Sequence, residues 1–133
     1  MTAFLHHFAF EFKTGLRNST MLFMNYLFPL GFYLLMGFVM PSLNPFFLET
    51  LIPAMVVFAI LAGTLLGVPD PLVNAREAGI FRSYKINGVP AISILSIPAL
   101  TTSLHLTIVA AIITFSAPLL FDAPLPVSWF GYV

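Results

Sequence analysis

The chain has 133 residues and a net charge of zero; 59% of its residues are hydrophobic and only 8% are charged. In water-soluble domains, about a quarter of all residues are charged. This composition therefore excludes an ordinary soluble domain and indicates an integral membrane protein. The five basic residues form no stripe suited to nucleic acid, and the absence of cysteine excludes disulfides and thiolate metal sites.

The charged residues leave three uncharged runs, 18–48, 50–69 and 86–121, each long enough to cross a bilayer. About 20 helical residues span the hydrocarbon core of ~30 Å. We therefore predict an all-α integral membrane protein with one transmembrane domain over residues 1–133. Its expected parts are an interfacial helix at 3–17, transmembrane helices at 21–40, 51–68 and about 92–120, and a cytosolic loop at 70–90. No soluble domain fits beside them, so a large function outside the membrane requires a partner.

Residues 3–17 favour an amphipathic helix, because a step of about 100° per residue separates two kinds of side chain. One arc holds Phe4, Leu5, Phe8, Ala9, Phe12 and Leu16, and the other holds His6, His7, Glu11, Lys13, Thr14 and Arg17, with Phe10 as the exception. This pattern is typical of a helix lying in the membrane interface, and a frayed tail is the alternative. The same polar residues exclude a secretory signal. Asn18 to Thr20 then supply capping groups for the first span.

The first predicted span contains Pro29, which is tolerated in lipid when neighbouring groups satisfy the freed carbonyl. We therefore expect a kink between Asn25 and Pro29 rather than a break. Asn25 is expected either to bond across helices or to line a polar cavity. The turn-forming residues from Pro41 to Pro45 are expected to end the span.

The second predicted span carries Pro53 in its first turn, where the missing N–H has no cost. Ala59, Gly63 and Gly67 recur every four residues and form a smooth strip that lets two helices approach closely. Pro69-Asp70-Pro71 is expected to end the helix at the membrane face.

The third predicted span has polar or small residues on two faces and carries Pro98, which predicts another kink. One face holds Ala99, Ser103, Thr107 and Ala111, and the other holds Thr101, Thr102 and His105. We expect protein on both sides of this helix. His105 is an ionisable group well inside the membrane, which suggests a proton relay or a substrate contact. The alternative is a neutral imidazole that bonds Thr101 or a neighbouring helix.

The basic residues predict the orientation of the chain. All five precede the first span or lie between the second and third: Lys13, Arg17, Arg76, Arg82 and Lys85. The positive-inside rule then places the N-terminus in the cytoplasm and the C-terminus outside, in a multi-pass protein of the cell membrane.

Catalytic and metal-binding patterns are not evident. His6 and His7 are adjacent and therefore point to different helix faces, unlike the i, i+4 pair of a helical metal site. The sequence has no P-loop, no Gly-x-Ser-x-Gly motif and no pair of carboxylates within a span. We therefore predict no metal site, no cofactor and no enzymatic activity in this chain.

The loop at 70–90 has the features of a docking element. Read as a helix, it places Val73, Ile80, Phe81 and Tyr84 on one arc, with Glu77 among them and Arg82 and Lys85 on another. Aromatic residues beside charges are typical of interfaces between proteins. A loop whose basic residues merely fix the orientation is the alternative, and the spacing alone does not separate the two.

The segment Arg76-Glu77-x-Gly79-x-Phe81-Arg82, followed by Pro90 and a further span, resembles the connection between the second and third transmembrane helices of ABC-2 type transporter permeases. The amphipathic N-terminus, Pro29 and Ile52-Pro53 match the same family in order. The resemblance implies a coupling helix that contacts an ABC ATPase subunit through Arg76, Glu77, Gly79, Phe81, Arg82 and Tyr84. ATP hydrolysis would then occur in that separate subunit, and the chain would be part of an exporter whose cargo the sequence does not reveal.

Two features depart from the family. Ala75 stands where family members often have an acidic residue, and this chain has three predicted spans where they usually have six. The resemblance therefore implies the N-terminal half of a permease, either a fragment or one part of a split subunit. Its further partners would be a second permease copy or the remaining half, together with the lipid bilayer.

Two other hypotheses explain the same spans. A small membrane scaffold or assembly protein would need no catalytic groups and could use the glycine strip to oligomerise. An intramembrane enzyme or proton carrier would depend on His105, although no second ionisable group accompanies it within a span.

Overall fold

The computed structural model describes residues 2–67, 73, 76–77, 79–86, 88 and 91–125, and every regular element in them is a helix. The elements are α1 (Thr2–Arg17), α2 (Ser19–Leu22), the π-helical turn η1 (Phe23–Leu27), α3 (Phe28–Leu43), α4 (Phe47–Ala62), the π-helical turn η2 (Gly63–Gly67), α6 (Ile80–Ile86) and α7 (Ala91–Phe121). Helical stretches long and apolar enough to cross a membrane cover Ser19–Leu43, Phe47–Leu65 and Ser96–Phe121. The predicted all-α class is confirmed for these residues, and three helices are long and apolar enough to cross a membrane, as predicted.

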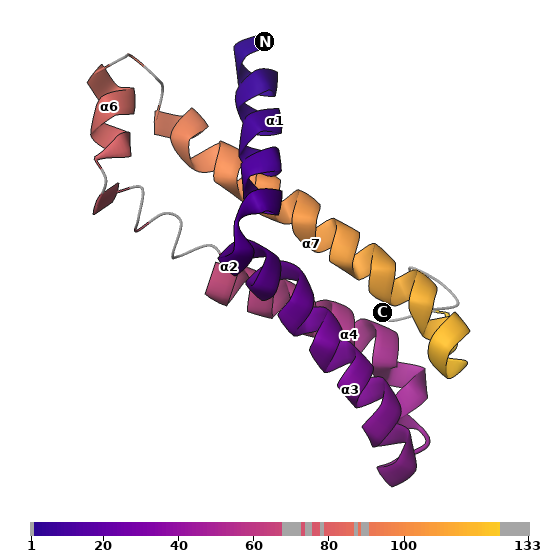
Figure 1. Cartoon of the computed structure of the whole chain (residues 1–133). Coiled ribbons are helices and arrows are strands. Elements are labelled where there is room, and N and C mark those ends of the chain that lie inside the picture. The colour runs from indigo at the N-terminus through magenta and orange to yellow at the C-terminus, as the bar shows by residue number, and fades with distance from the viewer. Residues whose placement is uncertain are drawn as a thin grey trace.

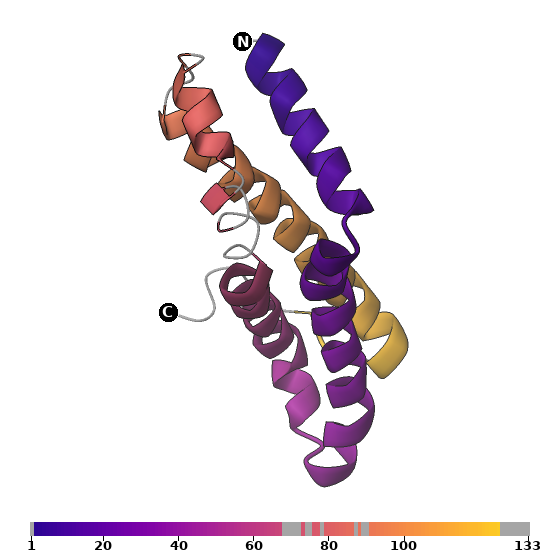
Figure 2. The same ribbon diagram turned by 60° about the vertical axis from the view of Figure 1, so that its left-hand side comes forward.

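The three long helical stretches, which contain α3, α4 and α7, pack side by side (Figure 1). α3 and α4 form an antiparallel hairpin, and α7 lies against both of them. α1 rises from the start of the first span toward the end of the molecule where α6 lies, whereas the connection between α3 and α4 is at the opposite end (Figures 1 and 2). We call these two ends the α6 end and the turn end.

Asn18 separates α1 from the first spanning helix. Its backbone is extended, and its side-chain oxygen accepts hydrogen bonds from the N–H groups of Thr20 and Met21 at 3.0 and 3.2 Å. This is the geometry of an N-cap, which satisfies backbone donors that the first turn leaves unpaired. The predicted cap is confirmed.

Pro29 accounts for the π-helical turn η1. Proline has no N–H, and its ring collides with the carbonyl four residues earlier, which here belongs to Asn25. The N–H of Phe28 instead bonds the carbonyl of Phe23, five residues back. Where a kink is predicted, the structure has a π-helical turn, and the helix continues unbroken to Leu43, as expected.

The turn end differs from the sequence prediction. The first span does not stop at Met40, because α3 continues through Pro41, and α4 begins before the predicted Leu51. Residues 44–46 make the turn, which begins with the extended Asn44: its side-chain oxygen accepts from the N–H of Phe46 and its carbonyl from the N–H of Phe47.

Two residues of α4 shift position as a consequence. Pro53 lies in the second turn of α4 and not in its first turn. Glu49 lies in the first turn and is exposed, where a negative charge is favoured by the helix dipole. Pro53 therefore does not occupy the first-turn position, where a missing N–H costs no hydrogen bond.

The apolar core occupies the turn end and the middle of the bundle. It consists of Tyr33, Leu51, Ile52, Met55, Ala59, Val109, Ile113, Ala117 and Ala123. Gly37 lets α3 approach the last turn of α7 closely, because the ring of Phe121 occupies the space that a Cβ atom would need. Tyr33 and Ser116 join the same two helices through a hydrogen bond of 2.9 Å between their hydroxyl groups.

The third span, α7, has 31 residues and extends for about 46 Å, which exceeds the ~30 Å hydrocarbon core. Pro98 and Pro118 both lie inside this helix. The predicted helix end at Pro69-Asp70-Pro71 and the residues from 126 onward lie outside the described part of the chain.

Candidate functional site

A layer of buried polar side chains lies toward the α6 end of the spans. Its members come from η1 and α7, and their exposed fractions are 1% for Asn25, 2% for Thr101, 6% for Thr102 and 2% for His105. Polar groups in a membrane interior are costly unless they are bonded, and they commonly mark functional positions. We call this set the polar layer.

Two other elements, η1 and α1, contact the imidazole of His105. Its Nδ1 atom shares a hydrogen bond of 2.6 Å with the hydroxyl of Tyr26 in η1. The ring of Phe12 in α1 stacks on it with centroids 4.5 Å apart and an interplanar angle of 14°. One turn further along α1, Gly15 is buried, and a Cβ atom there would lie 3.2 Å from Nε2 of His105. The last turns of α1 therefore cover the imidazole directly.

The polar layer is incompletely bonded. Among the described residues, Oδ1 of Asn25, Oγ1 of Thr101 and Nε2 of His105 are buried without a hydrogen-bond partner. A buried polar atom left unpaired costs about 1–3 kcal/mol, and such atoms are rare in native interiors. A neutral His105 is expected to bond either Thr101 or a neighbouring helix. In the structure it bonds Tyr26 of η1 and not Thr101.

Both π-helical turns border the polar layer. η2 contacts η1, and both contact α7. Gly63 begins η2 and is buried; a Cβ atom there would lie 3.3 Å from Oδ1 of Asn25 and would collide with the side chain of Leu106. π-Helical turns interrupt the regular helical ladder and often occur at functional sites. The two spans that cross this level are therefore irregular at the same place.

The glycine strip of the second span is divided by η2. Ala59 is 1% exposed and belongs to the core, and Gly63 packs beneath α7. The step from Gly63 to Gly67 lies within the π-helical turn, so the three residues do not continue one regular helical face. The surroundings of Gly67 lie outside the described side chains.

The two predicted faces of α7 have different environments. Thr101, Thr102 and His105 face the bundle interior. On the other face, Ala99, Ser103 and Thr107 are exposed and Ala111 is half-buried. The hydroxyls of Ser103 and Thr107 bond the carbonyls four residues earlier, at 2.8 Å. Both hydroxyl groups on the exposed face are therefore hydrogen-bonded. Of the two faces predicted to be covered by protein, this chain covers only the one that carries His105.

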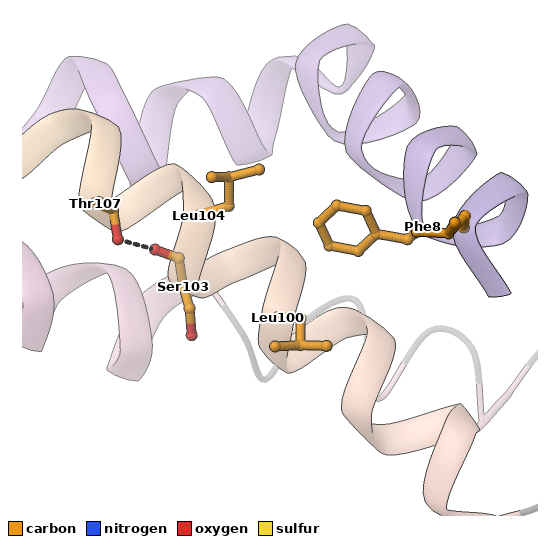
Figure 3. Close-up of a pocket in the computed structure, with 6 residues that line it drawn as sticks. Phe8, Leu100, Ser103, Leu104 and Thr107 are labelled. Carbon is orange, nitrogen blue, oxygen red and sulfur yellow. Dashed lines mark hydrogen bonds between the residues drawn. The ribbon is translucent and has the colours of Figure 1, made fainter. Parts of the chain in front are cut away.

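An apolar groove of about 430 Å³ lies beside the exposed face, between α1 and α7 (Figure 3). Leu5 and Phe8 line it from α1, and Leu100 and Leu104 line it from α7, with Ser103 and Thr107 along the α7 wall. Figure 3 shows the Phe8 ring pointing toward α7. Part of the apolar arc of α1 therefore packs against protein.

The described coupling residues lie in helical positions 76–77, in the turn at Gly79 and in α6 (Figure 1). Arg76 and Glu77 are helical and exposed, and the carbonyl of Arg76 accepts a hydrogen bond of 3.1 Å from the N–H of Gly79. Gly79 has φ of +70°, a conformation that side chains with a Cβ rarely adopt. The arc predicted from Val73 through Tyr84 is therefore interrupted, and a new helix starts at Ile80.

Within α6, Phe81 is half-buried and Arg82 is exposed, while the side chain of Tyr84 lies outside the described set. α6 contacts α7. A Cβ atom on Gly79 would meet nothing within 4 Å, so the glycine provides a bend and not a close approach within the chain.

Sequence reasoning missed three residues of the site: Phe12, Gly15 and Tyr26. An apolar arc looks the same whether it faces lipid or protein, so Phe12 carried no signal of its contact with His105. Gly15 is a poor helix former inside the amphipathic segment, which is one sign of a close approach. Tyr26 follows Asn25 directly, but nothing in the spacing pairs it with a residue 79 positions away.

Among the described residues, no group of three His, Asp or Glu side chains lies close enough together to hold a metal ion. In comparisons with known proteins, no protein-family model, no curated protein and no solved structure matches the chain.

Proposed function

We propose that this chain is the membrane-spanning permease part of an ATP-driven exporter of the ABC-2 type. In this role it passes motion from a separate ATPase subunit to its transmembrane helices. The observation that carries the proposal is the bend at Gly79, which has exposed Arg76 and Glu77 before it and α6, with exposed Arg82, after it.

The geometry of α6 suits a coupling element. Arg76, Glu77 and Arg82 are exposed and free to contact a partner, while Phe81 is half-buried. The bend at Gly79 lets the turn and the helix present their side chains in different directions. Interfaces of this kind combine an aromatic anchor with charges at the rim.

Motion of α6 has a direct route into the spans. α6 contacts α7, and α7 contacts α1, α3, α4 and both π-helical turns. A displacement of α6 by the ATPase would therefore act first on the helix that carries His105. The polar layer and its π-helical turns are the irregular level at which the helices would adjust.

The same proposal assigns roles to the remaining parts. α1 is the family's interfacial helix, with Lys13 and Arg17 exposed. The three spanning helices bury only 22% to 33% of their most apolar stretches, so much of their surface is available to lipid and to further helices. A second copy or the remaining half of a permease would occupy part of it. The N-terminus and α6 lie in the cytoplasm, where the ATPase is.

The test is to reverse one charge in the coupling segment of the complete transporter. Glu77→Lys should abolish transport-stimulated ATP hydrolysis and weaken co-purification with the ATPase, because it places a like charge beside Arg76 at the interface. Glu49→Lys is the matched control, because Glu49 is also an exposed helical carboxylate but lies at the turn end. Equal ATPase binding and transport in both variants and the unmodified chain would refute the coupling role.

The second candidate, a small three-span scaffold or assembly protein, is favoured by the exposed face of α7. Ala99, Ser103 and Thr107 offer a small-residue surface whose hydroxyls are already bonded. A scaffold predicts that Ser103→Leu disrupts association of the chain in the absence of any ATPase. It also predicts that Glu77→Lys has no effect, so the two variants distinguish the functions.

A further inference from the structure

We propose that His105 is a proton-binding site and that α1 is its lid, docked on the neutral imidazole and released when the imidazole takes up a proton. The proposal does not depend on the transporter function. It rests on the contacts that surround the ring and on the polar atoms of the layer that have no partner.

The neutral ring fits its surroundings on two sides. Phe12 covers one face by stacking, and the Tyr26 hydroxyl bonds Nδ1 at 2.6 Å. A neutral imidazole carries one N–H, so it can use Nδ1 either as acceptor or as donor toward Tyr26. Either way, the Nε2 atom is not bonded and faces Gly15.

The protonated ring does not fit. Both ring nitrogens of an imidazolium carry hydrogen, so Nε2 becomes a charged donor that requires an acceptor. On the side of Nε2, α1 presents Gly15, which has no side chain and whose carbonyl already accepts from the N–H of Asn18. A charged group buried without an acceptor is strongly unfavourable, so ionisation favours a state in which water reaches Nε2. Since α1 covers that atom, α1 must move away.

No carboxylate in the described part of the chain bonds to His105. On α1, Glu11 is half-buried next to Phe12 but forms neither an ion pair nor a hydrogen bond with the imidazole, and His6, Lys13 and Arg17 are exposed. α2 and both π-helical turns contribute Tyr26 and no charged residue, and α7 contains no Asp, Glu, Lys or Arg. The two basic residues of α1 add repulsion to an ionised His105, which also favours release.

The hinge for this movement is present. Asn18 is extended between α1 and α2, and its side chain caps the spanning helix independently of where α1 lies. α1 can therefore swing without unwinding the first span. The partner-free atoms of Asn25 and Thr101 remain behind in the layer, where water admitted by the movement can bond them.

The experiment uses the full chain in nanodiscs, with two introduced cysteines as the sole labelling sites because the chain has none. Spin labels at Phe10→Cys on α1 and Phe115→Cys on α7 report the position of α1, since both residues are exposed. We expect a single narrow distance distribution at about pH 8 and a longer, broader one at about pH 5, the range in which imidazole titrates. An unchanged distribution across this range would overturn the proposal.

Two variants assign the change to His105. His105→Gln keeps a polar side chain that does not titrate, and it should abolish the pH response. His6→Gln combined with His7→Gln removes the other two histidines of the chain and should leave the response intact. A response that persists in His105→Gln, or that disappears in the double control, would refute the assignment.

The double control also provides a direct measurement, because it leaves a single histidine. In that variant, ¹⁵N spectra of the imidazole should show protonation of His105 over the same pH interval in which the spin-label distance changes. Gly15→Ala supplies an independent check, because its Cβ atom would lie 3.2 Å from Nε2 and should shift α1 toward the released position even at high pH. Protonation of His105 with α1 still docked would show that α1 is not the lid.

Discussion

The turn end and the α6 end of the helix bundle are built from the same three spans but are packed in opposite ways. At the turn end, regular α-helices enclose an apolar core, and the Tyr33 and Ser116 hydroxyls bond each other. At the α6 end, two π-helical turns flank a polar layer in which three atoms lack partners. At the turn end, the hydrogen bond and the packed core hold the helices in one arrangement. At the α6 end, the unpaired polar atoms can form new hydrogen bonds when the helices move.

The glycines show the same contrast. Gly37 at the turn end faces the rigid ring of Phe121, while Gly63 at the polar layer faces the flexible end of the Leu106 side chain. Both let helices approach closely, which is how helices associate in lipid, where apolar burial gives no driving force. Rotating the end of the Leu106 side chain can make room for an atom added at Gly63. The ring of Phe121 has no flexible end that could do the same at Gly37.

The largest expected effect comes from overfilling these two contacts. Gly37→Leu should lower the free energy of unfolding by about 1–3 kcal/mol, because the new side chain forces Phe121 or the helix to shift. Gly63→Leu should cost less, about 1–2 kcal/mol, because Leu106 can adjust. SDS unfolding titrations in mixed micelles measure both changes.

Gly31→Leu is the matched control, because Gly31 lies on the same helix as Gly37 and a Cβ atom there meets nothing within 4 Å. It should be close to neutral. Should Gly63→Leu prove more damaging than Gly37→Leu, the polar layer is the more rigid end and the comparison is reversed.

A smaller effect is expected from removing one hydroxyl at each end. Tyr33→Phe should cost about 0.5 kcal/mol, because Ser116 keeps a bond to the carbonyl of Ile113. Tyr26→Phe should cost more, about 1 kcal/mol, because Nδ1 of His105 loses the partner that the structure gives it. The same unfolding titration compares the two, and equal losses would indicate that Nδ1 finds another partner.

Much of the fold follows from simple features of the sequence. Gaps between charges locate the three spans, Asn18 identifies the cap, and Pro29 identifies the irregular turn, because each effect is local. The error at Pro41 is also local: the turn-forming residues 41–45 predict an early helix end, but the turn starts only at Asn44.

The site was less predictable because its contacts are not local. His105 and Asn25 attract attention by being polar within apolar runs, but Tyr26 and Phe12 reach His105 from distant parts of the chain. An amphipathic pattern predicts a helix with one apolar face without identifying what covers that face. The interfacial position of α1 and the coupling role of α6 therefore stay predictions.

The last prediction concerns topology and has no expected cost in stability. Ser42→Cys lies in the last turn of α3 at the turn end, and Ser83→Cys lies in α6. Because the cysteine-free chain gives no background, an impermeant thiol reagent should label each variant from one side of the membrane only. Ser42→Cys should react from outside and Ser83→Cys from the cytoplasm, since all five basic residues precede the first span or lie between the second and third.

This labelling decides where the two ends of the bundle lie. If both sites react from opposite sides as predicted, the polar layer is near the cytoplasmic face, within reach of an ATPase that acts on α6, and the apolar core is near the outer face. If Ser83→Cys reacts from outside and Ser42→Cys from the cytoplasm, α6 faces away from any ATPase and the coupling role fails. In that case the lid on His105 would respond to the pH outside the cell, and the scaffold function would explain the spans better. Reaction of both from one side would mean that fewer than three helices cross the membrane.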